Sequence, residues 1–302
     1  METVTPGSLK LPEGMVRLSD QLEQAWERLR RRYLSGLSSL TNVATGIRTL
    51  DDRLDGGFRR GNFTVLGAAS GHGKTTLALQ FARKAAGDCE DTSVVVFISP
   101  EMRNQDIAEM ETIANLGTTR NSMANDPEIL RDAYARDKAA ARTPENLLLV
   151  RLPRIEEGGL EELEGSLGML HSTVPIRMIA LDYAQYVVGE IDTGKRQRFA
   201  LAGDVVKVCD RMASGFDCAL LLTSQVNVTT EKGKLTNISL RESALFEHSS
   251  AAVLYFVREF DDMGHESAAY FRIGKNRYGS LGRIDVETRA GCYAVRAKEE
   301  RF

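Results

Sequence analysis

The stretch Thr64-Val-Leu-Gly-Ala-Ala-Ser-Gly-His-Gly-Lys-Thr-Thr-Leu77 decides how the rest of the chain is interpreted. It starts as an apolar strand, continues as a loop of small residues and ends where Gly73-Lys74-Thr75 opens a predicted helix. In this order, backbone N–H groups and the positive end of a helix dipole surround a phosphate chain. The usual pattern is GxxxxGK[ST], and here Ala68 stands at its first position. The alternative, a chance glycine-rich turn, does not explain the strand–loop–helix order.

This loop predicts ATP and Mg²⁺ as ligands. In loops of this kind the lysine, here Lys74, reaches the β- and γ-phosphates, and the hydroxyl of the next residue, Thr75, is a ligand of Mg²⁺. His72 either fills the loop or approaches the nucleotide. The candidate nucleotide-binding residues are Ser70, Gly71, His72, Gly73, Lys74, Thr75 and Thr76.

Three polar residues follow apolar strands and are candidates for the chemistry of phosphoryl transfer. Asp182 ends Ile179-Ala-Leu-Asp182 and is expected to orient Mg²⁺ together with Thr75. Glu101 follows the strand 94–98 and is expected to polarise a water molecule, and Gln225 follows the strand 218–223 and is expected to sense the γ-phosphate. Each of them taken singly has the alternative of a cap or turn residue.

The order of segments predicts an α/β fold with a mostly parallel, helix-covered sheet that C-terminal antiparallel strands extend. The apolar strands are predicted at 63–67, 94–98, 147–152, 176–182 and 218–223. The helices between them are predicted at 74–86, about 104–116, 127–141, 159–170 and 197–214. Strands without intervening helices are predicted at 252–258, 268–274, 282–287 and 292–296.

A separate helix is predicted ahead of this fold. Apolar residues step by four or three on one face, at Leu18, Leu22, Trp26, Leu29 and Tyr33. Asp20 and Glu23 are expected at its start, and Ser35-Gly36 at its end. The opposite, arginine-rich face is either solvated or a binding patch. We therefore predict residues 1–40 as a lead-in and docking helix and 41–302 as the main domain.

Composition excludes several classes of protein. The 302 residues carry 39 Lys and Arg against 42 Asp and Glu, a net charge of −3, so bulk positive charge cannot drive nucleic-acid binding, although a local basic stripe can. The longest apolar run, 251–257, is too short to span a membrane, and the N-terminus does not resemble a signal peptide. Four cysteines without CxxC spacing favour a reducing cytoplasm over a disulfide framework or a zinc site.

The order of the motifs resembles one family, the RecA-like ATPase domain of DnaB-type replicative helicases of bacteria and phages. The resemblance covers about residues 45–297, and several ordered motifs are more specific than a phosphate loop alone. The matching blocks are TGIRTLD (45–51), GAASGHGKTT (67–76), SPEM (99–102), LDYAQ (181–185), TSQVN (223–227), LRES (240–243) and KNRYG (275–279). The resemblance implies a six-membered ring around single-stranded DNA with ATP at the subunit interfaces.

The resemblance also assigns further residues. Lys275 and Arg277 match the basic pair that reaches into the neighbouring subunit's site; the alternative is a solvated hairpin turn. The expected DNA contacts lie in two loops, of which the second has the alternative of a solvated loop. These residues are Arg241, Glu242 and Ser243 in one loop and Lys195, Arg196 and Arg198 in the other. Ala244 stands where the family commonly has glycine.

The expected function is that of a ring-forming, ATP-dependent DNA helicase that translocates on single-stranded DNA and separates strands during replication. The family's separate N-terminal helical domain is not expected in this sequence, which therefore resembles either the short helicases of phages and plasmids or a helicase piece that serves another machine. A primase, a helicase loader or another replication protein is the expected partner, in a bacterial or phage-infected cytoplasm. The alternatives are a KaiC-like or recombination-type ATPase acting as an assembly factor, and a nucleotide-binding regulatory subunit without hydrolysis.

Overall fold

The chain divides into two compact units, Met1–Thr41 and Asn42–Phe302. The computed structural model describes residues 21–22, 25–27, 29–30, 42–89, 92–126, 128, 144–151, 159–182, 195–231, 234–240, 244–289 and 294–298. Of residues 195–200, 228–231, 234–237 and 289 it describes the backbone only.

The described residues of the first unit are helical, as the apolar spacing predicts. Leu22, Trp26 and Leu29 have exposed fractions of 59%, 69% and 49%. Their spacing of four and three residues places them on one helical face. Leu18, Tyr33 and both expected ends of the helix lie outside the described residues.

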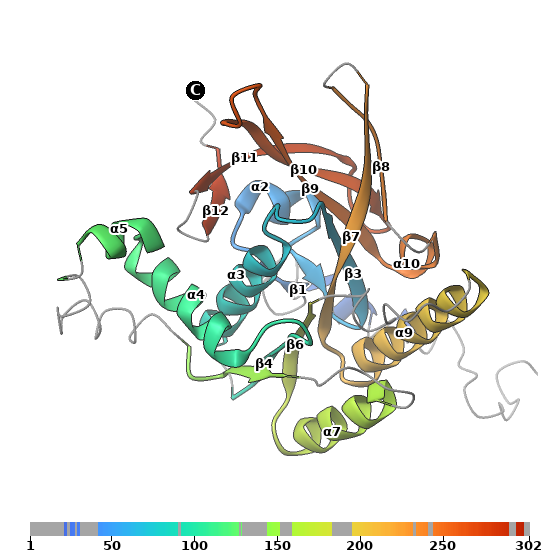
Figure 1. Cartoon of the computed structure of the whole chain (residues 1–302). Coiled ribbons are helices and arrows are strands. Elements are labelled where there is room, and N and C mark those ends of the chain that lie inside the picture. Colours follow the sequence, from blue (N-terminus) through green and yellow to red (C-terminus); the bar gives the residue numbers. More distant parts are fainter. Residues whose placement is uncertain are drawn as a thin grey trace, which may run out of the picture. The chain divides into compact units, whose positions relative to one another are not determined.

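The second unit is built on one large sheet whose strand order is β12-β11-β10-β9-β3-β7-β6-β4-β5 (Figure 1). The parallel strands are β3 (Asn62–Ala68), β4 (Val94–Ile98), β5 (Leu147–Val150), β6 (Ile176–Leu181), β7 (Ala219–Glu231) and β9 (Ala252–Phe260). The antiparallel strands are β8 (Lys234–Leu240), which pairs with β7, and β10 (Glu266–Asn276), β11 (Gly282–Arg289) and β12 (Ala294–Ala297). The predicted fold class is confirmed.

Helices cover both faces of this sheet, and each face has its own apolar core. One core lies beneath α2 (Arg48–Arg53), α3 (Lys74–Gly87) and α4 (Asn104–Leu116). The other lies beneath α7 (Gly159–Thr173), α9 (Lys195–Gly215) and α10 (Ala244–Ser249). Strand β4 is a continuous apolar run, because both of its faces are covered. Strand β6 is buried at all six positions, and Arg177 is its one charged residue.

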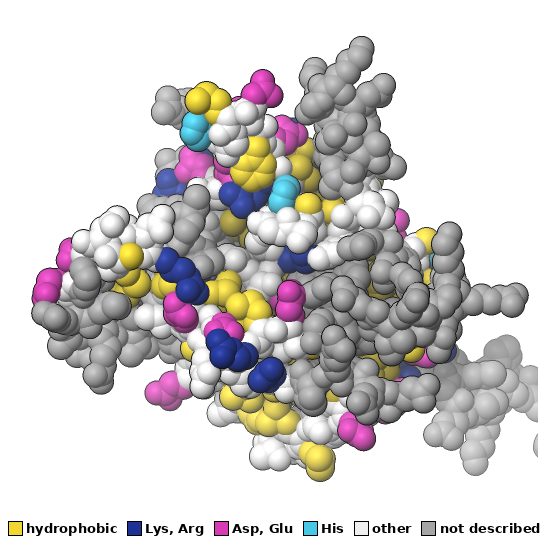
Figure 2. Space-filling model, in the orientation of Figure 1, with side chains coloured by type: hydrophobic (Ala, Val, Ile, Leu, Met, Phe, Trp, Pro, Cys, Tyr) yellow, Lys and Arg dark blue, Asp and Glu magenta, His cyan; other side chains and the backbone are white. Residues whose placement is uncertain are grey.

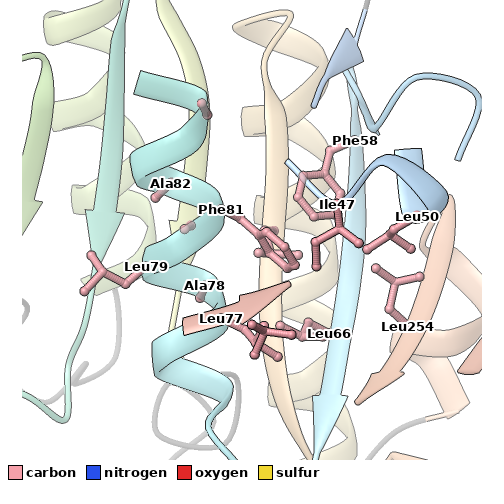
Figure 3. Packing of buried hydrophobic residues seen from close by; sticks show 14 of the residues in the cluster. Ile47, Leu50, Phe58, Leu66, Leu77, Ala78, Leu79, Phe81, Ala82 and Leu254 are labelled. Atoms are coloured by element: carbon pink, nitrogen blue, oxygen red, sulfur yellow. The ribbon is translucent and has the colours of Figure 1, made fainter. Parts of the chain in front are cut away.

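Phe81 of α3 is the centre of the first core (Figure 3). Its side chain is 0% exposed, and its ring packs edge-on against Phe58, with the ring centroids 5.3 Å apart. The centroid of the Phe271 ring lies 6.3 Å from that of Phe81. This packing fixes α3, and with it the phosphate loop, on the strands that carry the other candidate residues.

A small two-stranded sheet precedes β3, formed by β1 (Asn42–Val43) and β2 (Phe58–Arg59). A Cβ at Gly57 would lie 2.2 Å from the Val43 carbonyl oxygen, and its φ of +113° is one that L residues rarely adopt. The Asp51 carboxylate accepts hydrogen bonds from the backbone N–H groups of Thr45 (2.7 Å) and Gly46 (3.3 Å). These contacts explain the spacing of Thr45, Gly46 and Asp51 in the TGIRTLD block (45–51) and the glycine at position 57.

The structure corrects several of the predicted elements. The strand predicted to end at Thr223 continues to Glu231, because Val226–Glu231 pair with β8. Neither β8 nor the short helix α10 is predicted, and α5 (Arg120–Asn125) precedes the predicted helix 127–141, which lies almost wholly outside the described residues. The elements β1, α2 and β2 are also not predicted. The other predicted boundaries differ from the observed ones by a few residues.

Within the described residues, no helix is long and apolar enough to cross a membrane. Cys89, Cys209 and Cys218 are free thiols, and Cys292 lies outside the described residues.

We predict that Phe81→Ala lowers the free energy of unfolding by about 3–5 kcal/mol, because it leaves a cavity between α3 and the sheet. Urea denaturation followed by circular dichroism measures this change. The matched control is Phe260→Ala: that ring is 47% exposed, so a loss below about 1.5 kcal/mol is expected. Equal losses for both variants would contradict the assignment of the core.

Candidate functional site

The loop between β3 and α3 is shaped to receive phosphate groups. Gly71 and Gly73 have φ values of +75° and +93°, which glycine adopts without strain. Gly73 is the N-cap of α3 and provides no side-chain cap, so the first N–H groups of the helix are available to a ligand. Ser70 and Gly71 are exposed at the tip of the loop, and Thr76 lies in the first turn of α3. The predicted anion cradle is therefore present as a backbone shape.

A buried carboxylate lies directly beside this loop. Asp182 follows β6, is 0% exposed, and accepts hydrogen bonds from the hydroxyls of Thr75 (2.7 Å) and Thr223 (2.6 Å). Burial raises the pKa of Asp182, whereas the two hydroxyls and the charge of Lys74 lower it. The two residues predicted to hold Mg²⁺ are thus in contact through oxygen atoms, which are the ligands that Mg²⁺ prefers. The donor set fits the ion.

Lys74 is buried at the start of α3 and interacts electrostatically with two acids. Burial lowers its pKa, and the charges of Asp182 and Glu101 raise it. Glu101 is exposed just after β4. The buried Ser99 hydroxyl shapes this turn by accepting a hydrogen bond from the Met102 N–H (3.1 Å). The predicted water-polarising acid therefore lies within electrostatic reach of the phosphate-loop lysine.

Strand register places Gln225 beside the phosphate loop. Gln225 pairs with Ala68, the last residue of β3 before the loop, and Thr223 pairs with Leu66. The next parallel strand places Phe256 against the other side of Ala68. The sheet therefore brings Gln225 to the edge where the phosphate loop and Asp182 meet.

His72 packs against the end of β9. Its ring is edge-on to Phe260, with the ring centroids 5.7 Å apart, and the Arg258 guanidinium lies over the same phenyl ring at 5.1 Å. Burial lowers the pKa of His72, the charges of Arg258 and Lys74 lower it further, and Glu266 opposes them. His72 therefore does more than fill the loop, because it joins the loop to β9.

Lys275 and Arg277 lie at the other end of the strands. The Arg277 N–H donates to the Ala251 carbonyl, and the Ala251 N–H donates to the Phe63 carbonyl, both at 2.9 Å. Arg277 is therefore level with Phe63, five residues before Ala68, which corresponds to about 17 Å along β3. The backbone of the pair therefore lies away from the phosphate loop of its own chain.

The hairpin that carries this pair is anchored on α2. Asn276 donates from Nδ2 to the Arg53 carbonyl (2.9 Å), and Arg53 donates from Nη1 to the Leu281 carbonyl (3.0 Å). A Cβ at Gly279 would lie 2.1 Å from the Arg53 carbonyl oxygen. The Arg59 guanidinium lies over the Tyr278 ring, with its Cζ atom 4.0 Å from the ring centroid. These contacts disfavour a freely solvated turn.

The structure does not test the predicted DNA contacts. Arg241, Glu242 and Ser243 lie outside the described residues, and of Lys195, Arg196 and Arg198 only the backbone, in the first turn of α9, is described. Figure 2 shows one face of the molecule, on which described Lys and Arg side chains occur in small groups next to Asp and Glu.

Sequence reasoning missed two residues of this site. Thr223 belongs to the TSQVN block, and its position at the end of an apolar strand was the available signal for a partner of Asp182. Arg53 had no comparable signal, because its contacts with the 276–282 hairpin join residues more than 220 positions apart.

The family of the chain follows from comparison with known proteins. A model described as the DnaB-like helicase C terminal domain matches residues 42–294. The chain belongs to this DnaB-like family. A protein of Mycoplasma genitalium named "Replicative DNA helicase DnaB" is 26% identical over 291 residues, which cover 90% of this chain and 59% of that protein. The chain thus spans less than two thirds of the length of this DnaB relative.

Two solved structures share the fold. A structure described as an ATPase domain has a TM-score of 0.76 and 17% identity, and the match covers 94% of this chain and all of that one. The KaiC-like protein PH0186 of Pyrococcus horikoshii has a TM-score of 0.57 at 17% identity, over 85% of this chain and 98% of that one. At these identities the likeness concerns the fold alone. It agrees with the RecA-like core expected of this DnaB-like chain.

We predict that Thr223→Val makes Mg²⁺-nucleotide binding more sensitive to acid. In the wild type, the Thr223 hydroxyl lowers the pKa of Asp182. Its removal therefore raises that pKa, so the carboxylate is protonated at higher pH and loses affinity for the cation. Titration with a fluorescent ADP analogue and Mg²⁺ is expected to give a Kd at pH 6 raised by about five-fold relative to wild type, with a smaller change at pH 8.

Thr64→Val is the matched control, because Thr64 is buried on β3 away from the loop and pairs with Ala252. Its pH dependence is expected to equal that of the wild type. A Thr223→Val profile that also matches the wild type would remove Thr223 from the site.

Proposed function

We propose that this chain is the ATP-hydrolysing motor of a DNA helicase that forms a ring and moves along single-stranded DNA during replication. The observation that carries the proposal is the contact between Thr75, Asp182 and Thr223 beside an open helix N-terminus. Membership of the DnaB-like helicase family also supports a helicase function.

Each residue of the site has a chemical role in this proposal. Lys74 and the N–H groups of the loop hold the β- and γ-phosphates. The oxygens of Thr75 and Asp182 hold Mg²⁺, which supplies positive charge next to the phosphates when it is bound. Glu101 accepts the proton of the attacking water, and Gln225 reports the presence of the γ-phosphate.

The proposal places ATP hydrolysis between subunits. Arg277 and Lys275 supply positive charge to the transition state in the neighbouring site, as cations supplied in trans do in other nucleotide hydrolases. Their position level with Phe63, rather than with the phosphate loop, supports this assignment. The exposed face formed by Leu22, Trp26 and Leu29 is proposed to dock on an adjacent subunit of a six-membered ring.

DNA is proposed to contact two loops through its backbone charge. The residues concerned are Lys195, Arg196, Arg198, Arg241, Glu242 and Ser243. A primase or a helicase loader as partner remains a prediction from the family, as does the cytoplasm as location.

We predict that Arg277→Ala lowers ATP turnover by at least about 100-fold and leaves ATP affinity within about two-fold, because the residue acts at the neighbouring site. Mixing Arg277→Ala with Lys74→Ala chains is then expected to restore activity. In mixed rings, an intact phosphate loop from one variant meets an intact Arg277 from the other.

Steady-state ATPase assays on the separate and mixed variants measure this recovery, and native mass spectrometry confirms that both variants assemble. The control mixture combines Arg277→Ala with a chain that carries both substitutions. Loss of ATP binding in Arg277→Ala, or an unrecovered mixture of assembled chains, would place Arg277 in its own site.

We also predict that oligo-dT stimulates ATP hydrolysis and that the protein displaces a strand from forked DNA. Binding of oligo-dT is expected to weaken as salt rises, since backbone charge dominates the contact. ATPase rates with and without oligo-dT, and strand displacement followed by fluorescence, measure both activities.

Variants at Lys195, Arg196 and Arg198 provide the test of the basic loop, with Lys207→Ala as a control on the exposed surface of the same helix. The alternative is an ATPase that is not a helicase, and the fold similarity to a KaiC-like protein is the observation behind it. ATP hydrolysis without DNA affinity or strand displacement would favour that alternative.

A further inference from the structure

The short helix α10 holds both members of the predicted trans-acting pair. Lys275 donates from Nζ to the carbonyl oxygens of Glu247 (2.7 Å) and His248 (2.5 Å). Arg277 donates from Nη2 to the His248 carbonyl (3.0 Å). The last carbonyls of a helix have no partner within the helix and carry partial negative charge, so they suit cationic donors. The position of the pair therefore depends on the position of α10.

Tyr255 of β9 fixes the other side of this contact. Its hydroxyl donates to the Glu247 carboxylate (2.6 Å), and its ring is nearly buried. A Cβ at Gly274 would lie 2.5 Å from this ring, so glycine is required there, and the pairing of β10 with β9 shifts register at this residue. Tyr255 thus contacts both α10 and the strand residue next to Lys275.

The same helix adjoins the segments that carry the predicted DNA contacts. It begins directly after residues 241–243 and packs against α9, which begins at Lys195, and against β8, which ends at Leu240. Leu245 lies 3.8 Å from the position that a Cβ would take at Gly203 of α9, and Phe246 belongs to the apolar cluster shared with both elements. Helix α10 is therefore covalently continuous with residues 241–243 and packed against the helix that carries Lys195.

We infer that α10 couples DNA contact to the Lys275–Arg277 pair, and that Glu247 and Tyr255 are its positioning residues. This inference rests on the proposed function. DNA bound at the loops fixes α10, the carbonyls of Glu247 and His248 then set the direction of the two cations, and hydrolysis in the neighbouring site accelerates. Tyr255 holds α10 in a fixed position relative to β10, the strand that leads to the pair.

The test compares two tyrosines of similar chemistry. Tyr255→Phe removes the hydroxyl that holds Glu247 and keeps the ring against Gly274. Tyr270→Phe removes a hydroxyl that donates to Glu259 at 3.0 Å, on the same sheet but at the end of β9 away from α10. Both variants lose one hydrogen bond to a carboxylate, so their unfolding midpoints are expected to be similar.

With oligo-dT present, Tyr255→Phe is expected to lower the kcat for ATP by about five-fold or more and to leave the KM for ATP within about two-fold. Tyr270→Phe is expected to keep both values within about two-fold of the wild type. A purely structural role of Tyr255 would instead move both variants together, and that result would overturn the inference.

Glu247 provides a second arm, because its side chain is only partly buried and its replacement is expected to leave the fold intact. Glu247→Gln keeps an acceptor oxygen for Tyr255 and is expected to retain DNA stimulation, whereas Glu247→Ala is expected to lose it. The double variant Tyr255→Phe with Glu247→Ala is expected to be no worse than Glu247→Ala alone. Equal defects in Glu247→Gln and Glu247→Ala would overturn the inference.

The outcomes also separate the inference from the function on which it rests. If the wild-type chain hydrolyses no ATP, either with or without oligo-dT, both the proposed function and the inference are wrong. A wild type that DNA stimulates, together with a Tyr255→Phe variant equal to Tyr270→Phe, would remove the inference alone.

Discussion

The candidate site depends on one buried carboxylate. Asp182 has no exposed surface, and a charge in that position is unfavourable unless donors surround it. The donors come from two other elements, the Thr75 hydroxyl at the start of α3 and the Thr223 hydroxyl near the middle of β7. The same contacts therefore hold a helix and two strands in the relative positions that a phosphate chain and its cation require.

The apolar packing gives this polar centre its rigidity. Phe81 fixes α3 from one face of the sheet, while α7 and α9 cover the other. Between the two cores, the register of β3 with β7 and β9 sets which residues reach the edge where the phosphate loop begins. Close-packed layers of this kind transmit displacement with little loss, because their side chains have few alternative positions.

The sequence predicts the parallel strands and the phosphate loop well because both have strong local signals. Apolar runs mark buried strands, and Gly73-Lys74-Thr75 after such a run is specific. The ribbon of β7 and β8 was not predicted, although Val226 and Val228 alternate with polar residues, because those polar residues interrupt the continuous apolar run. Helix α10 escaped because six residues are too few to show a helical period. The contacts of Thr223 with Asp182 and of Arg53 with Asn276 join residues 41 and 223 positions apart, and only the folded sheet brings them together.

The length of β7 has a mechanical consequence. Its first residues lie inside the sheet, and beyond Gln225 the strand continues to Glu231 paired only with β8. The portion from Gln225 to Glu231 extends about 20 Å, so the ribbon of β7 and β8 projects beyond the strands that border the phosphate loop. Any rotation of this ribbon about Gln225 would displace its far end more than its base, because displacement grows with distance from the axis.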